Sequence, residues 1–283
     1  MGRPAAGKSG SGAATSGEKR RWGGQQRGRW LAFGVVTADP LAPLLELPGV
    51  ADGVAAARAA VDALLGNRVL RRRSADVSAE SSLRGAWASA WLAGAEVALD
   101  DVRSGAAAAD PVVQGALRAQ AAIASLTDTW TRAPRQALAR LHAVAAADLV
   151  ADTAELGRPT APPEVAARLD TLAAVLAATS APAVVVAGIV HGELLSLDAF
   201  APASGVVARV AVRLTLIERG LDPKSLVVVE AGHRELRGAY DAALTAYRTG
   251  TPDGVAQWLT HCADAVIAGA QESTAICEAM ARS

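Results

Sequence analysis

Two apolar segments near the middle of the chain have the spacing of buried helices. The first, residues 182–197, has no charged side chain before Glu193. The second, residues 205–219, repeats apolar residues every three or four positions, which is the period of one helix face. Helices with so little polar surface are usually buried on most sides. The pattern therefore predicts a buried central helix pair, joined by a short loop at residues 198–204.

Seven further segments have an amphipathic helical pattern. They cover residues 51–65, 78–92, 110–127, 134–150, 164–179, 233–247 and 252–282. Asp110 followed by Pro111 is typical of a helix start, because Asp caps the helix and Pro suits its first position. The chain has no repeat period and no alternation of strands with helices. We therefore predict a single all-α domain at residues 40–283, with about nine helices.

Residues 1–39 differ in composition from the rest of the chain and are predicted to be a disordered basic leader. Up to residue 34 they hold seven basic residues and one acid, Glu18, a net charge of +6 in a chain whose total is zero. They are rich in Gly and Ser and have no periodicity. The segment is either a genuine basic tail or the product of a start site placed too early. The string at residues 2–9 matches a phosphate-binding loop but lacks the preceding strand and following helix that such a loop needs.

Composition excludes several classes of protein. The net charge of zero gives no sign of nucleic-acid binding, and no apolar run reaches the 18 residues of a membrane span. Cys262 and Cys277 lie in one predicted helix, about 22 Å apart along its axis. That separation is too large for a disulfide, so we expect reduced thiols and a cytoplasmic protein.

The four histidines are dispersed along the chain, and no metal-binding spacing occurs. We therefore predict no metal site. His191 lies on an apolar helix and is expected to be a core residue, whereas His142 is expected to be partly exposed. Trp87 and Trp91, one helical turn apart, are also expected in the core.

The loop between the central helices resembles the active loop of the Fic (Fic/Doc) family, which reads His-Pro-Phe-x-Asp/Glu-Gly-Asn-Gly-Arg-x-x-Arg. Phe200, Gly205 and Arg209 match this pattern. His191 matches a histidine that the family often has seven residues before the catalytic one. The likeness extends from about residue 64 to the C-terminus. It implies a Fic-like fold, and family members typically transfer AMP from ATP to a protein hydroxyl.

Four positions of the loop depart from the family pattern. Asp198 stands where the family has its catalytic His, and Pro202 replaces the metal-binding acid. Ser204 replaces the Asn, and Val206 replaces a phosphate-binding Arg. Asp198 is the sole candidate for a general base, and aspartate is a weaker base than histidine at neutral pH.

A second family feature is an inhibitory helix that reads Ser-x-x-x-Glu-Gly, whose Glu pairs with the last Arg of the motif. Ser89 and Gly94 fit this pattern, but Ala93 replaces the Glu. The segment is either a remnant of the inhibitory helix or an ordinary helix end. Residues 151–163 correspond to the flap that clamps target peptides in the family, and they are too few for two paired strands.

The start of the second central helix is a candidate anion or nucleotide site. We expect Ser204 to cap this helix and Gly205 to allow close approach of a ligand to the backbone. Free backbone N–H groups at a helix start favour an anion, and Arg209 could add a charged hydrogen bond. The carboxylate of Asp198 opposes phosphate at the same place.

Three functions remain open. The first is a binding or regulatory module with a degenerate, inactive AMP-transfer site and an unidentified protein partner. The second is an active AMP transferase that uses the altered motif together with ATP and Mg²⁺. The third is a helical interaction module unrelated to Fic chemistry. The loop substitutions favour the first, for which we expect no cofactor, no nucleic acid and no membrane.

Overall fold

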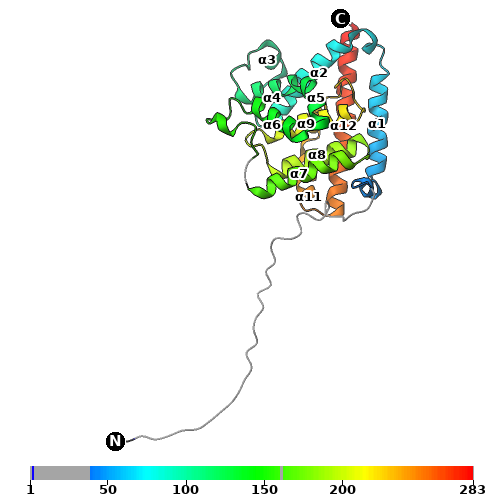
Figure 1. The fold of residues 1–283 in the computed structure, drawn as a ribbon. Coiled ribbons are helices and arrows are strands. Elements are labelled where there is room, and N and C mark those ends of the chain that lie inside the picture. The colour runs from blue at the N-terminus through cyan, green and yellow to red at the C-terminus, as the bar shows by residue number, and fades with distance from the viewer. Residues whose placement is uncertain (1, 3–38, 160–161, 283) are drawn as a thin grey trace.

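The computed structural model describes Gly2, residues 39–159 and residues 162–282. These residues form twelve α-helices and two short 3-10 helices, with no strand among them, which confirms the all-α prediction (Figure 1). The elements in chain order are η2 (Ala42–Glu46), α1 (Val50–Leu65), α2 (Leu70–Leu92), α3 (Leu99–Ser104), α4 (Pro111–Ala121), α5 (Ile123–Arg132), α6 (Pro134–Ala145), η3 (Thr153–Glu155), α7 (Pro163–Ala178), α8 (Ala183–Leu197), α9 (Ser204–Glu218), α10 (Val229–Glu235), α11 (Arg237–Tyr247) and α12 (Pro252–Arg282).

Helices α8 and α9 are the predicted central pair, and they pack against each other in the middle of the molecule (Figure 1). Residues 184–194 of α8 are all buried, as are twelve of the fifteen residues of α9. Helix α12 has 31 residues and is therefore about 46 Å long. It packs against α1, α8, α10 and α11, so it joins both sides of the fold to the central pair.

The structure has more helices than the nine expected, because two predicted helices are each divided and α3 was not anticipated. The breaks fall at Ala122, between α4 and α5, and at Leu236, between α10 and α11. Neither residue breaks helices by itself, so tertiary packing determines where the chain turns. The helix start at Asp110 is confirmed, since its carboxylate accepts hydrogen bonds from the N–H groups of Val112 and Val113 at 2.8 and 3.1 Å.

Several glycines bring neighbouring backbones into direct contact, and two helix crossings are the tightest of them. A Cβ atom placed on Gly115 of α4 would lie 2.1 Å from the carbonyl oxygen of Ala145 in α6. A Cβ atom on Gly232 of α10 would lie equally close to the carbonyl oxygen of Ala265 in α12. No side chain fits at such a distance, so these crossings depend on glycine.

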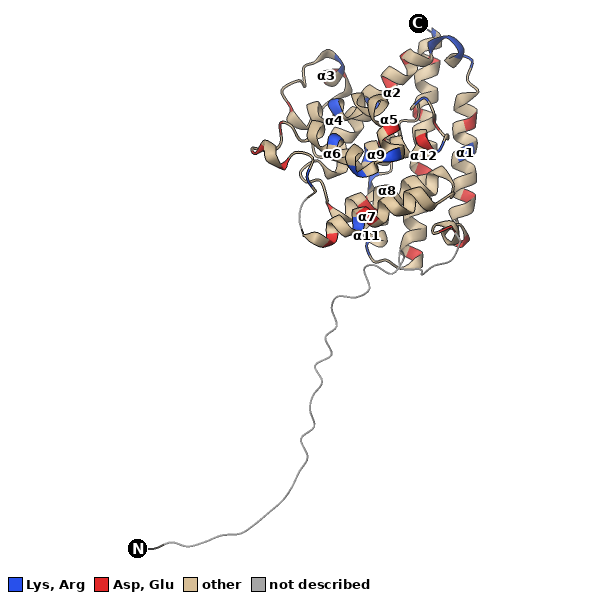
Figure 2. Cartoon of the chain, viewed as in Figure 1, with Lys and Arg blue, Asp and Glu red and all other residues tan. Residues whose placement is uncertain are grey.

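The predicted leader, with its phosphate-loop-like string, lies outside the described residues except for Gly2 and Asp39. The carboxylate of Asp39 accepts hydrogen bonds from the hydroxyls of Thr179 and Ser180, at 2.6 and 2.8 Å, just after α7. Figure 2 shows acidic and basic residues interspersed over the outer helices. None of the described helices combines the length and apolar character that crossing a membrane requires.

Candidate functional site

The loop between α8 and α9 begins at Asp198, whose backbone has the left-handed φ of 47° and ends α8. Asp tolerates this conformation better than most residues do. Asp198 is exposed, whereas Phe200 is buried at 2% exposure. The backbone N–H of Ala203 donates to the carbonyl of Phe200 at 2.9 Å, which makes the loop a tight turn. The loop therefore presents a carboxylate to solvent and inserts an aromatic ring into the core.

The expectation that Ser204 caps α9 is wrong. The helix begins at Ser204 itself, and no side chain caps it. The Ser204 hydroxyl instead accepts a hydrogen bond from the backbone N–H of Phe200 at 3.0 Å. Because Ser204 already lies in the first helical turn, its side chain points back to the loop and closes it rather than covering the free N–H groups of α9.

Arg209 and Ser89, which the sequence marked separately, are in direct contact. The Nε of Arg209 donates to the Ser89 hydroxyl and its Nη2 to the Ser89 carbonyl, both at 2.9 Å. Arg209 is 3% exposed and Ser89 is fully buried. A Cβ atom on Gly205 would lie 3.1 Å from two guanidinium nitrogens, so Arg209 covers the first turn of α9. Gly94, by contrast, lies past the exposed end of α2.

Within the ranges that the structure describes, Arg209 forms no ion pair with a carboxylate. Burial raises the pKa of the nearby Tyr240 hydroxyl on α11, and the positive charge of Arg209 opposes that shift. Ser89 therefore holds a buried cation that pairs with no carboxylate among the described residues. Buried charges usually need such hydrogen bonds to be tolerated at all.

Three histidines from three helices meet beside Tyr240, and we call His191, His233 and His261 the histidine cluster. His191 Nε2 lies 3.0 Å from the Tyr240 hydroxyl, and His233 Nδ1 lies 3.0 Å from His261 Nε2. The expectation of a core histidine at position 191 agrees with its full burial. Nothing in the sequence pointed to His233 and His261, because they lie on different helices with no shared motif.

Burial keeps the histidine cluster neutral. It lowers the pKa of His191 and His233 well below the ordinary value, and the nearby charge of Arg209 lowers both further. Burial also lowers the pKa of His261 to about 4. Among the described residues, no three His, Cys, Asp or Glu side chains are arranged to hold a metal ion.

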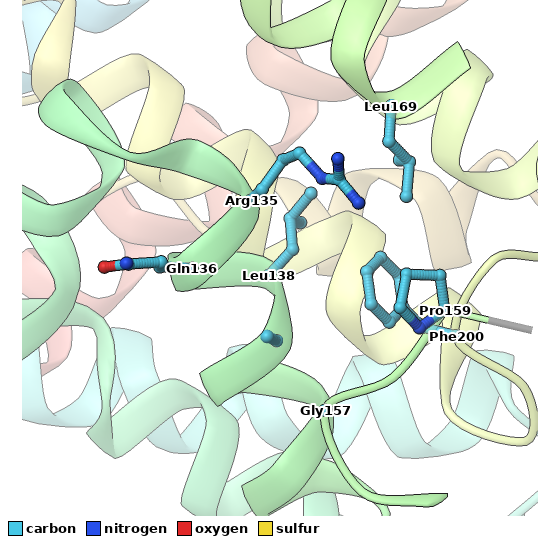
Figure 3. A pocket seen from close by; sticks show the side chains of 8 residues that line it. Arg135, Gln136, Leu138, Gly157, Pro159, Leu169 and Phe200 are labelled. Carbon is cyan, nitrogen blue, oxygen red and sulfur yellow. The ribbon is translucent and has the colours of Figure 1, made fainter. Parts of the chain in front are cut away.

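A pocket of about 190 Å³ lies beside the loop (Figure 3). Its walls come from α6, from α7, from the segment after η3 and from the loop. It is lined by Arg135, Gln136, Leu138, Ala139, Gly157, Pro159, Leu169 and Phe200. Arg135 pairs with Asp170 of α7. No motif in the sequence indicated this pocket, because its walls are separated along the chain.

His142 connects two walls of the pocket, and the expectation that it is partly exposed is wrong. It is 1% exposed, and its Nδ1 accepts the backbone N–H of Gly157 at 3.1 Å. Its ring centre lies 5.5 Å from that of Phe200. Burial lowers the pKa of His142. His142 thus links the predicted flap region to the loop.

Comparison with known proteins identifies the fold. No protein-family model and no curated protein sequence matches this chain. Among solved structures, a Fic family protein from Desulfovibrio desulfuricans G20 is similar, with a TM-score of 0.66 and 17% identity over 81% of this chain and 75% of that one. Fic-1 (residues 134–508) from C. elegans has the same TM-score and identity over 84% of this chain and 75% of its own. At this level of identity the likeness establishes the fold alone, and the chain therefore has a Fic-like fold.

Proposed function

We propose that this Fic-like domain is a binding or regulatory module that does not transfer AMP. The observation that carries the proposal is the state of Arg209. It lies against the first turn of α9, and its guanidinium is buried and already donates hydrogen bonds to the hydroxyl and the carbonyl of Ser89. A phosphate at this helix start would have to displace those contacts.

The hydrogen bonds from Arg209 to Ser89 make phosphate binding at this helix start unfavourable. A hydrogen bond to a charged group contributes about 1.5–3 kcal/mol. Releasing even one of them on ligand binding would weaken the affinity by roughly 10- to 100-fold. The exposed carboxylate of Asp198 adds repulsion, and Val206, which is buried at 4% exposure, offers no charge in place of the family's Arg.

The residues for the chemistry are also missing from the loop. AMP transfer needs a general base near the attacking hydroxyl and a metal ion on the phosphates. Asp198 supplies a weaker base than histidine does, and Pro202 has no oxygen in its side chain to hold Mg²⁺. We therefore expect no AMP transfer.

The pocket beside Phe200 supports a protein ligand rather than a nucleotide. Pockets for whole small molecules usually measure about 300–1,000 Å³, whereas a cavity of about 150 Å³ holds a benzene-sized group. At about 190 Å³ this pocket fits one Leu or Phe side chain, and its walls are mostly apolar. We propose that it receives such a side chain from a partner protein that docks over the loop.

The first experiment is an AMP-transfer assay with labelled ATP and Mg²⁺, with the protein itself and a mixture of hydroxyl-bearing proteins as targets. We expect no covalent label. Label that appears with the natural sequence and disappears in Asp198→Ala would establish the alternative, an active transferase with an altered motif. Calorimetry with MgATP and with inorganic phosphate should give no measurable heat of binding.

The second experiment tests the pocket with N-acetyl-leucine amide and N-acetyl-phenylalanine amide as probes. We expect both to shift the methyl NMR signals of Leu138 and Leu169. Ala139→Leu fills the pocket and should abolish the shifts, whereas Ala167→Leu enlarges an exposed alanine of α7 and should leave them unchanged. Absence of shifts in the natural protein would remove the pocket from the proposal without affecting the AMP-transfer result.

A further inference from the structure

The surface between α2 and α10 carries an arginine on two tryptophans, and we call Trp87, Trp91 and Arg234 the tryptophan patch. The Cζ of Arg234 lies 4.2 Å from the ring centre of Trp87 and 4.9 Å from that of Trp91. The two tryptophans lie one turn apart on α2, so they share a face of that helix. Both are half-buried rather than core residues, contrary to the expectation from sequence.

The guanidinium of Arg234 has no hydrogen-bond acceptor and no carboxylate within 4.0 Å among residues 39–159 and 162–282. Its Nε is buried and unpartnered. The neighbouring Arg237, whose Cζ lies 5.8 Å from the ring centre of Trp91, pairs with Asp241 at 2.7 Å. Arg234 therefore supplies the one net positive charge of the patch, and its guanidinium is left without a hydrogen-bond partner among the described residues.

Cation–π attraction holds the guanidinium on the rings but does not satisfy its N–H groups. The rings exclude water from one side of the group, which makes the unmade hydrogen bonds costly. A carboxylate would satisfy two of them at once, because its two oxygens match the fork of an arginine. The unpartnered guanidinium on the two rings thus suits one planar anion beside an apolar surface.

We infer that the tryptophan patch binds an acidic segment of a partner protein, with a carboxylate on Arg234 and an apolar side chain against Trp91. Trp and Arg are the residues that most often dominate the binding energy of protein interfaces. A singly charged carboxylate matches the single unpaired cation of the patch, whereas the second charge of a dianionic phosphate would find no further unpaired cation there. The N-terminal residues 1–34 carry a net charge of +6, which does not complement the positive charge of Arg234.

The test uses the full chain and two short peptides, acetyl-Glu-Leu-Glu-Leu-amide and its counterpart with Gln in place of Glu. The indole N–H signals of Trp87 and Trp91 in NMR spectra, assigned with Trp→Phe variants, report on the patch. We expect the Glu peptide to shift both signals and the Gln peptide to shift neither. Arg234→Gln should weaken the binding of the Glu peptide at least 10-fold, and Arg58→Gln, at an exposed position of α1, should not change it.

Several results would overturn the inference. Equal binding of the two peptides would show that the carboxylate is not recognised. Unchanged binding in Arg234→Gln would show that another residue holds the peptide. If Arg234→Gln does not fold, Arg234→Lys replaces it, because lysine keeps the charge but lacks the paired N–H donors of the guanidinium. Undiminished binding of the Glu peptide to Arg234→Lys would count equally against the inference. A dimer in sedimentation that Arg234→Gln abolishes would identify a second copy of this chain as the occupant instead.

Discussion

Replacing Ser89 by alanine isolates the contact that fixes Arg209. The substitution removes one hydroxyl from a fully buried position and changes the volume little. Arg209 Nε then loses its acceptor, while Nη2 keeps the backbone carbonyl at position 89. An N–H of a buried cation is left without a partner, and such a loss costs about 1.5–3 kcal/mol.

The expected effect on thermal stability follows from this figure. In a domain of this size each kcal/mol shifts Tm by about 2–4 °C. Ser89→Ala should therefore melt about 3–12 °C below the parent, as followed by circular dichroism or calorimetry. Ser78→Ala is the matched control, because its hydroxyl lies on the same helix and donates to the Lys224 carbonyl at 3.1 Å at an exposed position.

Exposed substitutions of this kind usually change stability by less than about 0.5 kcal/mol, so the control should stay within about 2 °C of the parent. Equal melting temperatures for Ser89→Ala and Ser78→Ala would refute the reasoning. They would mean that Arg209 finds another acceptor at no cost and is available to a ligand.

Three further predictions concern the core, acid stability and the loop. Val210→Asp buries a carboxylate in α9 at a position with 0% exposure. The cost is several kcal/mol, and a variant that melts like the parent would contradict the position of this helix. Acid should destabilise the fold, because burial holds the pKa of the histidine cluster below its value in the unfolded chain. The contribution of these histidines to the free energy of unfolding is then fully present above about pH 6.5 and is lost as the pH falls below that value. With its pKa at about 4, His261 alone should cost about 2 kcal/mol at pH 5, and urea titrations that agree at pH 7 and pH 5 would exclude this. The double variant Asp198→His with Val206→Arg should bind phosphate or ATP measurably in calorimetry. If it binds no better than the parent, the loop does not form a Fic-like pocket, and a module unrelated to Fic chemistry becomes the better description.

The central helix pair could be predicted from sequence because its signal is local. Residues 182–197 carry almost no charge, and a helix of that composition has few places to lie except the core. The resemblance to the Fic loop also placed Ser89 and Arg209 in two separate motifs. The family pattern implied that the two segments meet, but through a Glu at position 93, whereas in the structure Ser89 makes the contact with Arg209.

The parts that sequence did not indicate depend on packing between distant segments. His233 and His261 gave no spacing signal, since the helices that bring them together are apart in the chain. The break at Leu236 follows no Gly or Pro, so no local propensity marks it. The role of Ser204 was misjudged because a shift of one residue in the helix start turns a capping residue into one of the first turn.

The glycine crossings have a consequence for recognising distant relatives. At Gly115 and Gly232 the side chain of any other residue would clash with a backbone carbonyl of the neighbouring helix. The short distance between the two helices therefore requires glycine at these positions. That constraint is independent of what the loop binds or catalyses. We therefore expect such positions to stay glycine in proteins of this fold whose loops differ as much from the Fic pattern as this one does. A search that weights the spacing of these glycines should then find Fic-like domains that a search for the loop motif overlooks.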